Sequence, residues 1–262
     1  MDPSAGRLMH ATFAFLGELG DAIHFIFVKQ TSRGGAEVGG TQLLPLLREH
    51  VLITVVAVAA ASAIALPLGT WLGHTGRGSF LVISVTNAGR AVPSIGVVFL
   101  FFAALGAGFF NITLALVLLA IPPILLNAYT GVRGVDPDTV DAARGMGLTG
   151  TQILSRVELP LALPLIFGGV KTSTVNVLAT ATLGPAAGVV TLGDPIINPS
   201  SYGDAGRLGA AIVVAVLAVA AEVGLSAVQR ALTPEGIKLA EAAPRQRGLR
   251  LAVPKRRIAS AS

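Results

Sequence analysis

Three charged residues, Arg90, Lys171 and Glu222, stand in or beside long runs of apolar residues. Charges at such positions are costly, so they face a cavity, a partner or an interface. They are therefore candidates for a path that carries a polar solute, or for ion pairs between helices. Arg90 and Glu222 also lie close enough to the ends of their runs for a structural role at the interface, whereas Lys171 lies deeper. A proton relay needs a chain of carboxylates or histidines, and these runs hold a single carboxylate.

A stripe of polar residues accompanies Lys171. Thr172, Asn176 and Thr180 recur every four residues, which places them on one face of a helix. Ser173 lies beside this face. Such a stripe is typical of a path for a small hydrophilic solute. The alternative is structural, because Ser and Thr side chains also bond to carbonyls of their own helix or join neighbouring helices.

The residue types needed for catalysis are scarce. The chain has no cysteine, which excludes disulfides, thiolate metal sites and cysteine nucleophiles. Its four histidines are isolated from one another, so we expect no metal site. A phosphate-binding run of the form G-x-x-x-x-G-K-[ST] is absent. We therefore expect no enzyme activity, no cofactor and no ATP hydrolysis by this chain itself.

The elements that hold these residues are predicted to be membrane-spanning helices. Of the 262 residues, 53% are hydrophobic and only 13% are charged, about half the charged fraction of an ordinary soluble domain. A helix needs roughly 20 apolar residues to cross a bilayer. We predict an all-α integral membrane protein whose domain, 50–238, has five spans, at about 51–73, 84–105, 111–132, 161–183 and 208–229.

Residues 1–49 form an extension of different character. The segment 13–28 is apolar but carries Glu18, Asp21 and His24, spaced by three along one helical face. This pattern favours an amphipathic helix at the membrane surface over the alternative, a sixth span.

Basic residues are concentrated on one side of the predicted spans, and eight of the 19 Lys and Arg residues follow residue 229. Because cytoplasmic loops carry an excess of Lys and Arg, that side is predicted to be cytoplasmic. Residues 239–262 are then a basic cytoplasmic tail, suited to anionic lipid headgroups. Nucleic-acid binding is not expected, because the tail lacks interleaved aromatic residues.

The segment 133–160, between the third and fourth spans, is predicted to be a rigid cytoplasmic protrusion. Asp136 and Pro137 form the usual start of a helix, which is expected to end at 145–147. Thr149 and Gln152 have the spacing of a capping box for a second short helix running to Pro160.

Residues of this protrusion follow a recognisable spacing, namely Asp141, Ala142, Ala143, Gly147, Val157, Leu159 and Pro160. They resemble the signature loop of ATP-binding cassette (ABC) importer permeases, which reads E-A-A, three residues, G, nine residues, I, any residue, L-P. Asp replaces Glu and Val replaces Ile. Further stretches, at 127–135, 169–174, 192–194 and 230–234, are similar to importers of glycine betaine, choline, carnitine or proline. The segment 185–191 departs from them, because it lacks their glycine-rich run.

The resemblance implies the inner-membrane component of a binding-protein-dependent importer in a bacterial plasma membrane. Two permease subunits, identical or related, would form the pore, and two copies of an ATPase would bind the protrusion around 137–157. Asp141 to Gly147 would couple the movement of the ATPases to the permease. A separate extracytoplasmic protein would capture the solute, since Trp71, Tyr129 and Tyr202 are too scattered to cage a quaternary ammonium. Two alternatives stay open: the same architecture serving methionine or a betaine-like thiol compound, and an autonomous channel or secondary carrier.

Overall fold

The computed structural model describes residues 3–32 and 35–233, and most of this chain is helical. The helices are α1 (Pro3–Phe27), α2 (Leu43–Thr75), α3 (Ser79–Ala91), α4 (Ser94–Leu105), α5 (Phe109–Arg133), α6 (Pro137–Gly145), α7 (Gly150–Ile153), α8 (Leu159–Ala181), α9 (Asp194–Ile197) and α10 (Pro199–Leu232). Between them lie the 3₁₀ helices η1 (Gly40–Gln42) and η3 (Gly184–Ala187), the short π-helix η2 (Leu154–Glu158), and an antiparallel hairpin of β1 (Gln30–Thr31) and β2 (Glu37–Val38). The predicted basic tail, 239–262, lies outside the described residues.

The all-α membrane fold is confirmed. Within the described chain, the helices α2, α5, α8 and α10 are long and apolar enough to cross a membrane, and α3 with α4 adds a fifth crossing if the pair is counted as one. The predicted spans 51–73, 111–132, 161–183 and 208–229 coincide with these four helices. α10 starts earlier than predicted, but Gly203, with φ of 71°, kinks it near that start.

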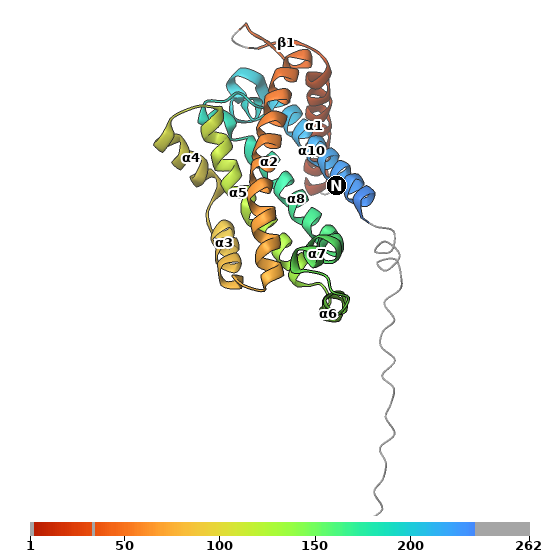
Figure 1. Ribbon diagram of the computed structural model, residues 1–262. Coiled ribbons are helices and arrows are strands. Elements are labelled where there is room, and N and C mark those ends of the chain that lie inside the picture. Colours follow the sequence, from red (N-terminus) through yellow and green to blue (C-terminus); the bar gives the residue numbers. More distant parts are fainter. Residues whose placement is uncertain (1–2, 33–34, 234–262) are drawn as a thin grey trace, which may run out of the picture.

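The predicted span 84–105 is not one continuous helix. It consists of α3 and α4, which meet at an angle of 89°. Pro93 causes the break: a proline disfavours the helical conformation of the residue before it, and Val92 is extended, with φ of −81° and ψ of 123°. The two short helices lie against α5, at the left of Figure 1.

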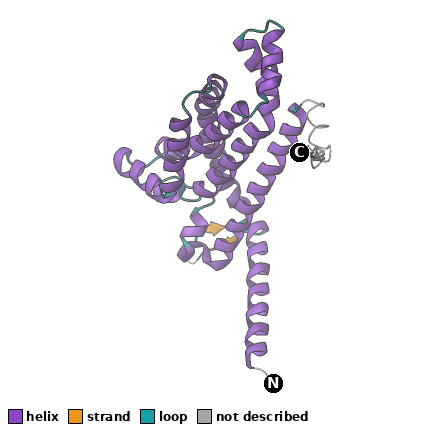
Figure 2. Ribbon diagram, turned by 90° about the horizontal axis from the view of Figure 1, so that it is seen from below, coloured by secondary structure: helices purple, strands orange, loops and turns teal. Residues whose placement is uncertain are grey.

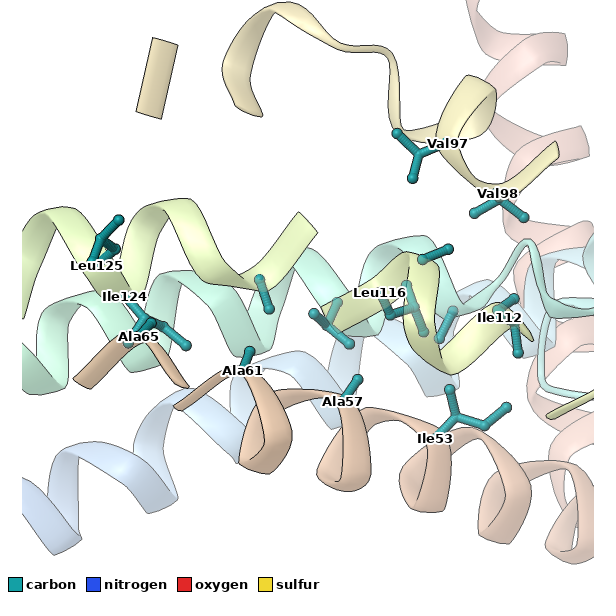
Figure 3. Close-up of a cluster of buried hydrophobic side chains, with 14 of the residues drawn as sticks. Ile53, Ala57, Ala61, Ala65, Val97, Val98, Ile112, Leu116, Ile124 and Leu125 are labelled. Atoms are coloured by element: carbon teal, nitrogen blue, oxygen red, sulfur yellow. The ribbon is translucent and has the colours of Figure 1, made fainter. Parts of the chain in front are cut away.

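The core of the molecule lies where α2 and α5 pack together. Ile53, Ala57, Ala61 and Ala65 face the larger side chains of α5 (Figure 3). The row continues, four residues at a time, to Gly69 and Gly73, which are also buried. A Cβ atom at Gly69 would lie 2.8 Å from the Cβ of Ala128. Small residues therefore let the two backbones approach closely, as membrane helices require for tight packing.

The N-terminal helix α1 packs beside the first part of α10. Phe25 is fully buried there, and a Cβ atom at Gly206 would lie 3.1 Å from its ring. Glu18, Asp21 and His24 are exposed, and so are the apolar residues Phe15, Leu16, Ile23 and Phe27 of the same helix. α1 is not among the described helices apolar enough to cross a membrane. Its N-terminal part extends beyond the other helices (Figure 2).

Candidate functional site

The helix α6 forms the tip of the predicted protrusion, at the opposite end of the bundle from the β1–β2 hairpin (Figure 1). Its start is capped as expected: Asp136 Oδ1 accepts a hydrogen bond from the backbone N–H of Asp138 at 2.9 Å. Its end turns sharply at Gly147, whose φ of 82° favours glycine. The signature glycine is therefore the residue that reverses the chain.

The signature residues of α6 divide between two faces. Ala143 is 2% exposed and packs inward, whereas Asp141 and Ala142 are exposed. Asp141 accepts a hydrogen bond from Arg144 at 2.7 Å, one helical turn away. Met146 is 74% exposed beside them. The outer face of α6 is thus available to another protein.

The second helix of the protrusion begins as predicted but does not end as predicted. Gln152 Oε1 accepts a hydrogen bond from the backbone N–H of Thr149 at 2.8 Å, which completes the capping box. The helix does not end at Pro160. α7 continues through η2 into α8, and Leu159 and Pro160 are the first residues of α8. The second helix of the protrusion and the fourth span are therefore one helical segment, bounded by Gly150 and Ala181.

A polar pair joins the base of this protrusion to α2. His74 Nδ1 donates a hydrogen bond to Glu158 Oε2 at 2.6 Å, and the Glu158 side chain is only 7% exposed. Both residues line a depression of about 200 Å³ together with Arg133 and Asp141. The sequence reasoning missed the pair, because 84 residues separate its members. The available signal was a carboxylate at the variable position of the signature, between Val157 and Leu159.

Three of the five predicted path residues, Lys171, Thr172 and Asn176, meet at a second depression, between α8 and α10. This depression has a volume of about 370 Å³ and is lined by Gly168, Lys171, Thr172, Val175, Asn176 and Glu222. Lys171 Nζ donates to Gln229 Oε1 at 2.8 Å and to Ser226 Oγ at 3.3 Å, both on α10. The sequence reasoning did not single out these two partners, although both share a helical face with Glu222.

Two residues of the predicted path do not line this depression. Ser173 is fully buried, and its Oγ donates a hydrogen bond to the carbonyl of Ala120 in α5 at 2.8 Å. It therefore joins α8 to the core, which is the structural alternative considered for the stripe. Thr180 bonds to the carbonyl of Asn176 in its own helix, also at 2.8 Å.

The three intramembrane charges do not pair with one another in the described structure. Arg90 lies in the last turn of α3, exposed and next to the α3–α4 bend. Within residues 3–32 and 35–233, the ion pairs do not include Arg90, Lys171 or Glu222. Ion pairs between the spans, one of the two possibilities for these charges, are therefore absent from this part of the chain.

The opposite end of the bundle is closed by the segment that contains Gly193 and Asp194. Asp194 accepts hydrogen bonds from Tyr202 Oη at 2.6 Å and Asn198 Nδ2 at 2.5 Å. A Cβ atom at Gly193 would lie 1.7 Å from the carbonyl oxygen of Thr182, so only glycine fits. Thr191, in the segment that lacks the usual glycines, is buried and bonds to the carbonyl of Ala181 at 2.9 Å.

Comparison with known proteins identifies the fold and the family. Residues 65–235 match the family described as "Binding-protein-dependent transport system inner membrane component". Among solved structures, the MetNI methionine ABC transporter in an inward-facing conformation superposes with a TM-score of 0.65 at 21% identity, over 73% of this chain and 96% of that one.

Named relatives are more similar in sequence. The glycine betaine/carnitine/choline transport system permease protein OpuCB of Bacillus subtilis is 34% identical over 77% of this chain and 94% of its own length. The carnitine transport permease protein OpuCB of Listeria monocytogenes is 36% identical over 76% and 92%. The osmoprotectant import permease protein OsmW of Salmonella typhimurium is 32% identical over 75% and 94%. The chain belongs to the family of binding-protein-dependent inner-membrane permeases of ABC importers.

Proposed function

We propose that this chain is the permease subunit of an ABC importer for osmoprotectants such as glycine betaine, choline, carnitine or proline. The observation that carries the proposal is the unbroken helical connection from the protrusion to the polar depression. α6 presents an exposed face at one end, and α7, η2 and α8 run from its base to Lys171, Thr172 and Asn176. The relatives named above supply the class of solute.

In this mechanism the ATPase is a separate subunit, present in two copies, which holds the outer face of α6. Ala142 suits such a contact because its small side chain lets a helix fit closely in a groove, while Ala143 anchors α6 to its own chain. When the ATPases close on ATP, their movement displaces α6. Because the His74–Glu158 pair ties the protrusion to α2, α2 and α8 move together, and the depression changes the side to which it opens.

We place the α6 end, and with it the C-terminus, in the cytoplasm. α6 must reach the ATPase, and Arg77, Arg133, Arg144 and Arg156 lie at that end, in keeping with the preference of basic residues for the cytoplasmic side. The other end holds Lys29, Arg48 and Arg207, of which Lys29 and Arg207 pair with Glu37 and Asp204. An extracytoplasmic binding protein would then deliver the solute to the end that holds α9. α1 would lie at the membrane surface, and a second permease subunit, identical or related, would complete the pore.

The test is uptake by proteoliposomes that contain the permease, its ATPase and its binding protein. Ala142→Glu, on the exposed face of α6, should abolish ATP-dependent uptake of glycine betaine and the co-purification of the ATPase. The matched control is Ala36→Glu, an exposed alanine on the hairpin at the opposite end, which should leave both unchanged. Unchanged uptake by Ala142→Glu would remove α6 as the contact. Uptake of methionine but not of glycine betaine would contradict the proposed class of solute. Solute flux in the absence of ATP would indicate an autonomous channel or secondary carrier.

A further inference from the structure

We propose that the depression between α8 and α10 is a two-charge subsite for a zwitterionic solute. Lys171 would hold the solute's carboxylate, and Glu222 would face its cationic group. The inference rests on the proposed function and specifies which part of the solute each residue contacts.

Lys171 carries a positive charge that nearby neutral groups only partly satisfy. Its two hydrogen-bond partners, Gln229 and Ser226, are both uncharged. A lysine ammonium has three N–H donors, so one is left after these two bonds. Within the described chain, carboxylate oxygens do not come within 4.0 Å of it. The ammonium is thus held in position with capacity to bind a carboxylate.

Glu222 supplies the opposite charge on the facing helix. It precedes Ser226 by four residues and Gln229 by seven, so the three side chains share one face of α10. Four residues of helix advance about 6 Å along the axis, which places Glu222 one turn away from the groups that hold Lys171. The two charges therefore border the same depression without forming an ion pair with each other. A solute with a carboxylate and a cationic group on a short chain is complementary to this arrangement.

The rest of the lining supports weak and reversible binding. Thr172 and Asn176 are exposed and offer a hydroxyl and an amide. Gly168 leaves room, since the only atom near a Cβ placed there would be Asn127 Oδ1 at 3.8 Å. The lining residues include no aromatic ring, so the cation–π cage that would hold a quaternary ammonium firmly is missing from this depression. Passage requires a site that a solute can leave as well as enter.

A pair of solutes separates the role of Lys171 from that of Glu222. Glycine betaine has a trimethylammonium group and a carboxylate, whereas choline has the trimethylammonium group and a hydroxyl. If Lys171 binds the carboxylate, removing its charge weakens the binding of glycine betaine but not the binding of choline. If Glu222 faces the trimethylammonium group, removing its charge weakens the binding of both solutes.

The experiment measures binding of each solute to the permease–ATPase complex in lipid nanodiscs, by saturation-transfer NMR. Lys171→Gln should weaken glycine betaine binding by about tenfold, the loss expected for one charged hydrogen bond, and leave choline binding unchanged. Glu222→Gln should weaken both, and Lys171→Arg should retain both. Lys29→Gln, at an exposed site on the hairpin, is the matched control and should bind like the wild type.

Three outcomes would overturn the subsite: absence of glycine betaine binding to the wild type, equal loss of both solutes in Lys171→Gln, or unchanged glycine betaine binding in that variant. Equal loss would indicate that Lys171 and Glu222 only stabilise the helix pair. The result is distinct from that of the uptake assay. If the complex transports glycine betaine but fails this binding test, the proposed function stands and the proposed subsite is wrong.

Discussion

The helices α2 and α10 are nearly equal in length, 33 and 34 residues, yet they meet their surroundings differently. In the most apolar stretch of each, α2 has 28% of its residues buried within the described chain and α10 only 11%. α2 turns a row of small residues toward α5. α10 instead exposes Val216, Val219 and Val223, which are 63%, 61% and 59% exposed.

The difference separates two kinds of information in an apolar sequence. High apolar content indicates that a helix lies in a membrane, whereas small residues at a spacing of four indicate which side of it contacts protein. Helices in a bilayer gain little by moving apolar side chains from lipid to protein, so close packing depends on small residues. The valine face of α10 is therefore left for lipid or for the second permease subunit.

The largest effect is expected when a bulky residue enters the packed row of α2. In Gly69→Leu, the new Cβ atom would lie 2.8 Å from Ala128 Cβ and 2.9 Å from the carbonyl oxygen of Leu125. We expect destabilisation of about 3 kcal/mol or more, because neither helix backbone can move away from the new side chain without breaking its packing contacts with the other helix. Thermal unfolding in detergent and the yield of monodisperse protein measure the loss.

Gly224→Leu on α10 is the matched control. A Cβ atom at Gly224 meets nothing within 4 Å in the described chain, so this variant should unfold within about 0.5 kcal/mol of the wild type. If Gly224→Leu proved as damaging as Gly69→Leu, the distinction between the two helices would be wrong.

The next effect concerns polar side-chain pairs at the ends of the same helices. Glu158→Ala removes the buried carboxylate that accepts the hydrogen bond of His74, and we expect a loss of about 2 kcal/mol. Uptake per ATP hydrolysed should also fall, since α2 would no longer follow the protrusion. Asp204→Ala breaks the exposed pair of Asp204 and Arg207, 3.4 Å apart near the start of α10, and should cost less than about 0.5 kcal/mol. An unchanged ratio of uptake to ATP hydrolysis in Glu158→Ala would show that the pair does not transmit movement.

A smaller effect separates two neighbouring residues of α8. Ser173→Ala removes the hydrogen bond to the Ala120 carbonyl and should lower the free energy of unfolding by about 1 kcal/mol. Thr172→Val changes an exposed side chain at the depression, so we expect unchanged stability and reduced uptake. Stability and uptake measured on both variants test this division, and the reverse result would move the path to the face of α8 that carries Ser173.

These residues also show how far the sequence predicts the structure. Four of the five spans, the Asp136 cap and the capping box depend on local patterns and are present in the structure. A spacing of four places Thr172 and Asn176 on one face of α8, and both line the depression. Periodicity does not determine which neighbour a face meets, so it does not reveal the contact of Ser173 with Ala120. The bend at Pro93 depends on a single residue within an otherwise apolar run. The contact between His74 and Glu158 is formed by the tertiary fold, and no local spacing encodes it.

The smallest effect is expected at the hairpin that leads into α2. Lys29 Nζ donates a hydrogen bond to Glu37 Oε2 at 3.0 Å, and this ammonium lowers the pKa of the Glu37 carboxyl. A carboxyl whose pKa is lower in the folded chain favours folding above the pKa of the unfolded chain, and the contribution disappears as the pH falls through the folded pKa. Both side chains are largely exposed, so solvent and salt screen the pair.

NMR titration should place the Glu37 midpoint lower in the wild type than in Lys29→Gln, and high salt should bring the two midpoints together. Coincident midpoints at low salt would contradict the pair. The loss in Glu158→Ala should resist salt, because burial shields the pair at the other end of α2 from the screening that weakens this one.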